Sequence, residues 1–283
     1  MEKIALVTDT TCDLSDEVVQ QYGIRLLPFR IHYKNNEYMD RFEITAQEVY
    51  DNFQIEIPKS STPTLKDIGE VLTEVEQAGY THCIFITLSS GLSAVYDSIN
   101  LVCKDHPQIK TFVFDSKSIS VGEGYLVEQC AQLIEKGVSF DNIIHDLKRI
   151  RSKMKLYFVV QTLEYLIKGG RIGRVSGTLG ELLNIKPVIT IDENDGKYIT
   201  YAKARGRKQS LDKILEIGEE LTHKSKQRIY VMSGSAHEEA LKLVDRLKTL
   251  PNITGVTYGG NISPVAGVHS GPGLVGVLFV EHN

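Results

Sequence analysis

Short apolar stretches rich in β-branched and aromatic residues alternate with amphipathic stretches along the first part of the chain. The apolar stretches predict strands at residues 3–8, 24–33, 82–87, 111–114 and 156–160. Two capping boxes mark helix starts between them: one begins at Thr45 and its helix runs through Phe53, and the other begins at Thr64 and its helix ends near Gly79. This alternation favours a mostly parallel sheet with helices on both faces.

The pattern changes after about residue 160, where a glycine-rich turn and a short helix follow. Apolar runs at 187–192 and 198–203 are joined by Asn194-Asp195-Gly196, which predicts a β-hairpin. The remaining pattern predicts helices at 211–221 and 237–247 and strands at 228–232, near Ile253 and near Leu274. We therefore expect an α/β protein with an N-terminal domain of residues 1–160, built on the mostly parallel sheet, and a second α/β domain of residues 161–283.

Composition and charge narrow the class of protein. A chain of 283 residues with 42% hydrophobic positions can bury a substantial core. Its 32 basic and 36 acidic residues are spread along the sequence without a basic block, which disfavours nucleic acid as a partner. The first apolar run is too short for a signal peptide, and no stretch approaches the roughly 18 apolar residues of a membrane span, so we expect a cytoplasmic protein.

The first candidate site is the hydroxyl-rich segment 60–64, which leads directly into a predicted helix. Ser60, Ser61 and Thr62 stand where free backbone N–H groups and the positive end of the helix dipole converge, so the segment could hold an anion. In the alternative interpretation, Thr64 only caps the helix and the serines belong to an ordinary loop.

The second candidate is the segment 87–96, which leaves a predicted strand and turns into a helix. Gly91 permits a tight turn, so Ser93 is expected in the first helical turn. A hydrolase would use Ser93 as a nucleophile, but the G-x-S-x-G pattern is absent because Val95 stands where the second glycine would be.

The third candidate is His269, in the segment 267–273 before the last predicted strand. Three glycines and a proline leave little room for a helix there, so we expect a constrained loop. A histidine in such a loop is well placed to bind a ligand; alternatively, it is a hydrogen-bonded structural group.

Two weaker candidates combine glycines with fixed positive charge. They contain Arg171 and Arg174 in the first case, and Arg205 and Arg207 in the second. Each is either a solvated loop or a docking surface for an acidic or phosphorylated partner. Phosphate-loop, dinucleotide and metal-ligand patterns do not occur, so we expect neither a cofactor nor a metal.

Taken in order, these segments resemble the DegV family over nearly the full length. The motifs that carry the resemblance are Thr8-Asp9-Thr10-Thr11-Cys12-Asp13-Leu14, Ser61-Thr62-Pro63, Leu88-Ser89-Ser90-Gly91-Leu92-Ser93, Asp115-Ser116-Lys117, Gly169-Gly170-Arg171-Ile172, Lys186-Pro187 and His269-Ser270-Gly271-Pro272-Gly273. The resemblance implies a two-domain protein that encloses one long-chain fatty acid between its domains. It also implies, for some members, the role of a non-catalytic subunit that presents the carboxylate to a bacterial fatty acid kinase and so feeds acyl groups into phospholipid synthesis.

The resemblance further implies that the carboxylate is held by the hydroxyls of residues 60–62, by Ser93 and by His269. Many relatives have Thr-Ser-Gln-Pro where this chain has Ser60-Ser61-Thr62-Pro63, which leaves open which of the three hydroxyls makes the contact. Two alternatives stay open. One is a lipid sensor or transport protein without a kinase partner, and the other is a serine hydrolase or acyltransferase that uses Ser93 and His269, with Asp97 or Asp115 as the orienting carboxylate.

Overall fold

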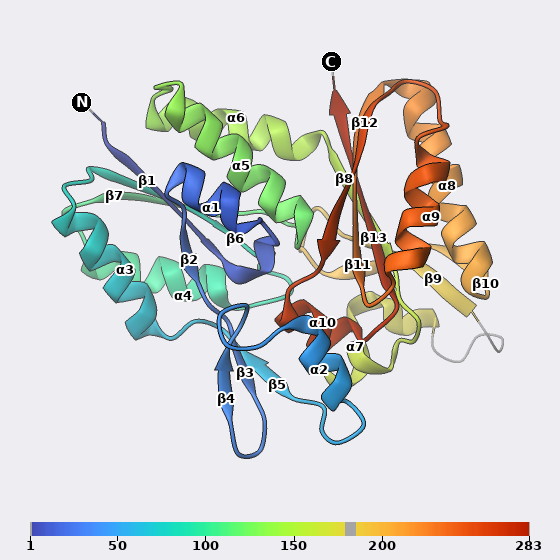
Figure 1. The fold of residues 1–283 in the computed structure, drawn as a ribbon. Helices are drawn as coiled ribbons and strands as arrows, with labels where there is room; N and C mark the ends of the chain where they lie inside the picture. The colour runs from blue at the N-terminus through green and yellow to red at the C-terminus, as the bar shows by residue number, and fades with distance from the viewer. Residues whose placement is uncertain (1, 179–184, 283) are drawn as a thin grey trace.

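The computed structural model describes residues 2–178 and 185–282 and contains two large sheets side by side (Figure 1). The first is parallel, with strand order β2-β1-β6-β7. Apolar side chains line both faces of its central strands because helices cover both faces. Its strands are β1 (Ile4–Asp9), β2 (Arg25–Leu27), β6 (His82–Thr87) and β7 (Lys110–Asp115).

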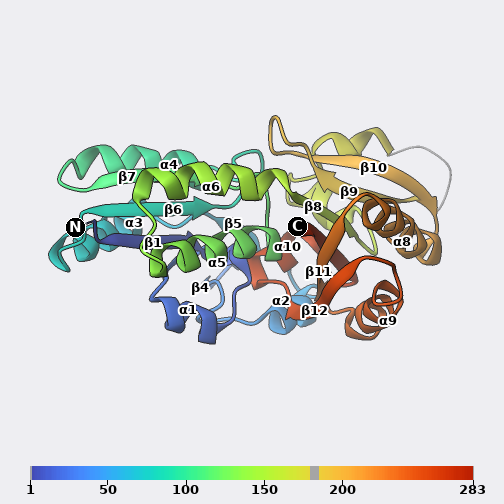
Figure 2. The same cartoon turned by 90° about the horizontal axis from the view of Figure 1, so that it is seen from above.

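Helices cover the two faces of this sheet, with one layer above and one below it in Figure 1, and Figure 2 looks down onto the upper layer. α3 (Leu65–Gln77) and α4 (Val95–Val102) pack on one face. α5 (Val121–Glu135) and α6 (Phe140–Ser152) pack on the other, next to α1 (Asp16–Tyr22). The predicted parallel sheet with helices on both faces is confirmed.

The second sheet is mixed, with strand order β10-β9-β8-β13-β11-β12. β11 and β12 are parallel and the other neighbours are antiparallel. α8 (Arg207–Lys224) and α9 (His237–Leu247) pack on one face of it. Its strands are β8 (Met154–Val159), β9 (Ile185–Ile191), β10 (Tyr198–Arg205), β11 (Lys226–Gly234), β12 (Ile253–Asn261) and β13 (Leu274–His282). The hairpin predicted around Gly196 is confirmed as the connection from β9 to β10.

A small antiparallel sheet lies below the two large ones in Figure 1 and has the order β4-β3-β5. It contains β3 (Arg30–His32), β4 (Glu37–Met39) and β5 (Lys59–Ser61). Beside it lie the short helices α2 (Ala46–Asn52), α7 (Glu164–Lys168) and α10 (Pro264–Ser270). Three 3-10 turns complete the described elements: η1 (Thr10–Cys12), η2 (Cys103–Asp105) and η3 (Gly173–Thr178).

Four local predictions were wrong. The strand predicted at 24–33 is two strands in different sheets, because Pro28 lacks the N–H group that a continuous ladder needs. The segment 59–61 is a strand instead of a loop, the segment before the last strand forms the helix α10, and Ser93 lies ahead of α4 instead of in its first turn. The predicted helix 211–221 extends over 207–224.

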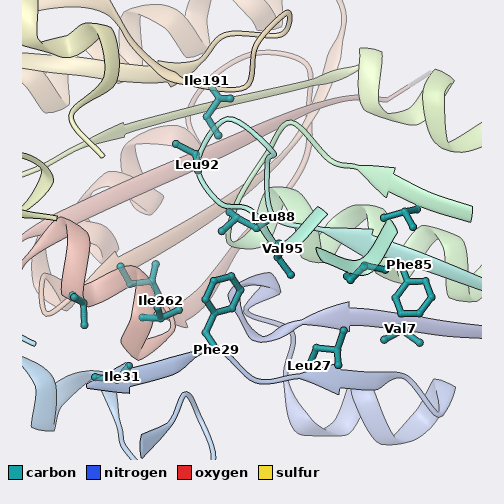
Figure 3. Close-up of a cluster of buried hydrophobic side chains, with 14 of the residues drawn as sticks. Val7, Leu27, Phe29, Ile31, Phe85, Leu88, Leu92, Val95, Ile191 and Ile262 are labelled. Atoms are coloured by element: carbon teal, nitrogen blue, oxygen red, sulfur yellow. The ribbon is translucent and has the colours of Figure 1, made fainter. Parts of the chain in front are cut away.

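One buried apolar cluster connects the two large sheets. Figure 3 shows Val7 and Phe85 of the first sheet in the same cluster as Ile191 of the second and Ile262 near α10. In addition, β8 precedes the predicted domain boundary at residue 160 yet pairs only with strands of the second sheet. The boundary at residue 160 stays a prediction, but the core itself is continuous between the two sheets.

Candidate functional site

An apolar cavity lies between the carboxyl-terminal ends of the first sheet's strands and the open face of the second sheet. Apolar side chains from the turn after β6 and from strands of the second sheet form most of its wall, among them Leu88, Leu92, Phe158, Met232 and Leu274. The side chains with polar groups that line the cavity are Thr11, Ser60, Ser93, Ser120, Arg171, Tyr198, His269 and Ser270.

The strand β5 separates the neighbouring serines. Side chains alternate between the two faces of a strand, so Ser60 and Ser61 point in opposite directions. The Ser60 hydroxyl faces the cavity and lies 2.7 Å from Nε2 of His269. Ser61 is exposed, with its Oγ 2.8 Å from Nε2 of His32, and neither it nor Thr62 lines the cavity.

His269 lies in the last turn of α10, with its ring against the backbone of Gly169. A Cβ atom at Gly169 would stand 2.2 Å from Nδ1, so only glycine permits this contact. Burial, together with the nearby charge of Arg171, lowers the pKa of His269 to about 4. The imidazole is therefore neutral at pH 7, and its buried Nδ1 has no hydrogen-bond partner among the described residues.

Ser93 lies on the turn between β6 and α4, in the wall of the same cavity. Its Oγ accepts a hydrogen bond from the backbone N–H of Val95 at 3.2 Å, which leaves the hydroxyl proton free to be donated. The turn is pressed against the β9–β10 hairpin, since a Cβ atom at Gly91 would stand 2.3 Å from the carbonyl oxygen of Asp195. Ser93 is thus held in place by contact between the two large sheets.

Arg171 was predicted as a docking residue, and the structure places it in the cavity wall. Its guanidinium donates to the carbonyl oxygens of Leu92 at 3.1 Å and Gly169 at 2.9 Å. These two bonds fix the cation between Ser93 and His269. The sequence pattern indicated the positive charge of Arg171 but not its position in the cavity wall, because the Leu92 carbonyl oxygen that it contacts lies 79 positions away.

The other three predicted docking arginines lie outside the cavity lining. Arg174 is half exposed and forms ion pairs with Asp192, at 2.6 Å, and with Asp195. Arg207 pairs with Glu239 at 2.8 Å, and Arg205 is exposed.

The described residues do not assemble a hydrolase triad. The hydrogen-bond partner of His269 is Ser60, not Ser93. Asp97 is exposed, and Asp115 accepts hydrogen bonds from the backbone N–H groups of Ser90 and Lys117 and pairs with the Lys117 side chain at 2.9 Å. Since no carboxylate orients Nδ1 of His269 in the part of the chain that the structure describes, the geometry gives the hydrolase alternative no support.

Two hydroxyls in another part of the cavity wall form hydrogen bonds with buried acids. The hydroxyl of Ser120 donates to Asp13, and that of Thr11 lies 2.6 Å from Asp9 and 2.8 Å from Glu123. One hydroxyl has one proton, so one of the two acids must donate to Thr11. Burial raises the pKa of Glu123 well above its usual range, and the adjacent charge of Asp9 raises it further. We therefore assign Glu123 as the neutral acid that donates to Thr11.

Two further buried acids hold the start of α10, the helix that carries His269. Asp13 accepts from the backbone N–H of Ser263, and Asp40 accepts from that of Val265, both at 2.8 Å. Burial raises the pKa of Asp13 to about 7 and that of Asp40 to about 6. The position of His269 is thus linked to residues near the start of the chain.

Within the described ranges, no three His, Cys, Asp or Glu side chains are grouped so as to hold a metal ion. No helix in these ranges combines the length and the apolar character that crossing a bilayer requires.

The fold and the cavity define a two-sheet α/β protein that encloses an apolar space with a cluster of polar groups. The family model described as "Uncharacterised protein, DegV family" matches residues 3–282, and this chain belongs to the DegV family. The family resemblance of the sequence motifs is confirmed.

Relatives in sequence and similar solved structures match this chain over almost its whole length. A DegV domain-containing protein of Clostridium acetobutylicum is 52% identical, over 99% of this chain and 100% of the relative. A fatty acid-binding DegV family protein from Thermus thermophilus has a TM-score of 0.91 at 29% identity, covering 99% of this chain and 100% of its own. DegV of Bacillus subtilis, described as a fatty acid-binding protein, has a TM-score of 0.90 at 26% identity, with 100% of both chains covered.

Proposed function

We propose that this protein binds one long-chain fatty acid, with the tail in the cavity and the carboxylate among Ser60, Ser93 and Arg171. The observation that carries the proposal is the Ser60–His269 pair, which faces an otherwise apolar cavity. The two solved DegV proteins described above, each named as fatty acid-binding, support the same ligand class.

Burial of the tail supplies the main favourable contribution to the free energy of binding. Burying about fifteen methylenes at roughly 0.8 kcal/mol each gives ~12 kcal/mol before the costs of association and ordering are subtracted. A carboxylate cannot be buried without partners, which would cost several kcal/mol, whereas each hydrogen bond to it contributes about 1.5–3 kcal/mol. The polar cluster at the cavity wall therefore decides whether the head group can enter.

The proton arrangement of the Ser60–His269 pair suits an anion. A carboxylate only accepts hydrogen bonds, so Ser60 must use its hydroxyl proton toward the ligand. Ser60 can do so when the neutral His269 carries its proton on Nε2 and donates to Ser60 Oγ. In this arrangement His269 is a positioning residue that acts through Ser60, while Ser93 and Arg171 supply the remaining donors.

We further propose that the protein acts in the cytoplasm as a non-catalytic subunit that presents the bound carboxylate to a fatty acid kinase, with the product consumed in phospholipid synthesis. A carboxylate oxygen would attack the terminal phosphorus of a nucleoside triphosphate held by the kinase. A P–O bond forms, the bond to the leaving nucleoside diphosphate breaks, and the product is an acyl phosphate. The exposed Arg205 and half-exposed Arg174 would meet an acidic surface of that partner.

The test compares two neighbouring serines. Ser60→Ala should weaken palmitate binding by the delipidated protein about 10- to 100-fold, since it removes one hydrogen bond to a charged group. Ser61→Ala, on the opposite face of β5, is the matched control and should bind like the wild type. Equal affinity for palmitate in wild type and Ser60→Ala, measured by titration calorimetry, would refute the assigned head-group site.

A further inference from the structure

A second hollow, open to the surface, adjoins the carboxylate end of the cavity. We call it the outer groove. Three turns form it: residues 91–94 before α4, residues 170–173 after α7, and Lys197 with Tyr198 at the start of β10. The outer groove and the cavity share the lining residues Leu92, Ser93, Arg171 and Tyr198. A ligand atom next to Ser93 and Arg171 can therefore be approached from two sides.

The charges that line the outer groove are positive. Arg171 is fixed in its wall by two backbone carbonyls, and Lys197 is exposed at its edge. The nearest acid on the same hairpin is Asp195, whose carboxylate forms an ion pair with Arg174 that lowers its pKa. The proposed fatty acid has one negative charge, for which Ser60, Ser93 and Arg171 already supply donors. Lys197 is a further cation that the carboxylate does not need.

The walls of the outer groove leave room for a group larger than a carboxylate. At Gly170, one of the lining positions, an added Cβ atom would meet no other atom within 4 Å, so the wall is open there. The apolar cavity on the other side of Ser93 is filled by the tail in the proposed complex. An additional polar group on the head of the ligand can therefore extend only outward, toward Lys197.

We propose that the outer groove binds a phosphoryl group attached to the carboxyl end of the bound acyl chain, with Arg171 and Lys197 as its cationic partners. This inference rests on the proposed function, because it assigns the place that the phosphorylated head group occupies. Doubly charged phosphoryl oxygens on a tail-anchored ligand would form charge-assisted hydrogen bonds with both cations.

The experiment uses hexadecylphosphonate as a stable probe and palmitate, with the same chain length, as the reference. Both are titrated into the delipidated full chain at a pH at which the phosphonate is doubly ionised. Lys197→Glu should weaken phosphonate binding about 10-fold at low salt, less at high salt, and change palmitate affinity less than 2-fold. Lys208→Glu, an exposed position on α8 with the same change in net charge, is the control and should leave both affinities unchanged.

Each outcome separates the two proposals. If palmitate binds and the phosphonate does not, or if Lys197→Glu weakens phosphonate binding no more than Lys208→Glu does, the outer groove holds no phosphoryl group and the fatty acid proposal stands. If neither probe binds the wild type, the proposed function fails first. A selective effect of Lys197→Glu on the phosphonate supports the inference.

Discussion

At the scale of single residues, the site depends on an imidazole that is kept neutral. His269 is partly buried on α10, with Gly169 against one ring nitrogen and Ser60 on the other. An imidazolium would carry protons on both nitrogens, and the one on Nδ1 would face Gly169 without an acceptor. Burial and the charge of Arg171 lower the pKa, and the tight contact with Gly169 leaves Nδ1 without a hydrogen-bond partner among the described residues.

Titration of the His269 ring tests this environment. In the delipidated protein we expect a pKa of about 4, because burial disfavours the charged ring. Binding of palmitate places a carboxylate near the ring and should raise the pKa, since a nearby anion favours the imidazolium. The measurement is a pH series of histidine ring NMR signals, assigned with a His269→Gln variant. A pKa near 6.5 in the empty protein would show that the ring is solvated.

Local sequence patterns singled out Ser60, Ser93 and His269, and only the family resemblance implied that they surround one carboxylate. The hydroxyl-rich turns and the histidine motif were visible as local patterns, but the contact between Ser60 and His269 spans 209 positions. The choice between Ser60 and Ser61 depends on the direction of each side chain in β5, which follows only once the strand and its pairing with β3 are known.

At the scale of elements, α10 shows where tertiary contacts override local propensity. Three glycines and a proline between residues 267 and 273 predict a loop, yet a helix runs through Ser270. Its first N–H groups are satisfied by Asp13 and Asp40, acids that are more than 200 positions away. Helix propensity is a weak prior, and distant partners for the helix start are invisible in a single sequence. In contrast, α2 and α3 begin where their local capping boxes predicted.

The acids that hold α10 predict how stability depends on pH. The folded-state pKa values, about 7 for Asp13 and about 6 for Asp40, lie above the usual 3.8, so stability is lost as the pH rises through them. Between pH 6.5 and 8 these two acids together should lower the free energy of unfolding by about 1 kcal/mol. His269 opposes this fall by about 0.4 kcal/mol, because its imidazole in the unfolded state still loses protons over this pH range while the folded one is already neutral. The neighbouring Asp9 and Glu123, whose pKa values are also raised, act in the same direction.

Urea unfolding at pH 6.5 and 8 measures this slope, with Asp13→Asn as the comparison. The asparagine keeps an oxygen that can accept from Ser263 and an amide that can donate to Ser120, but it does not titrate. We expect a smaller difference between the two pH values in the variant. Equal pH dependence of stability in the wild type and in Asp13→Asn would show that Asp13 titrates in its ordinary range.

At the scale of the whole molecule, the proposed ligand occupies part of the core. The apolar cluster that includes Val7, Phe85 and Ile191 also includes Leu88 and Met232, which line the cavity. The parallel sheet and the hairpin followed from the hydrophobic pattern. The cavity did not, because each wall residue looks like an ordinary core position until the two sheets are brought together.

Removal of the ligand should therefore lower thermal stability. A ligand present at 100 times its dissociation constant stabilises the folded state by about 2.7 kcal/mol. For a chain of this size, that corresponds to roughly 5–10 °C in the melting temperature. Differential scanning calorimetry of delipidated protein with and without added palmitate measures the shift, and decanoate is the control because its shorter tail buries fewer methylenes. No shift with palmitate would contradict a buried tail.

The continuous core also constrains how such proteins diversify. In the proposed complex, the residues that contact the tail also join the two sheets, so tail preference and folding stability would depend on the same side chains. A substitution at Met232 or Leu274 that admits a different tail also changes the packing between the sheets. New ligand preferences should therefore arise mainly through substitutions that conserve the total side-chain volume. Duplicated proteins that bind fatty acids with different tails should differ by paired substitutions on opposite sides of the cavity.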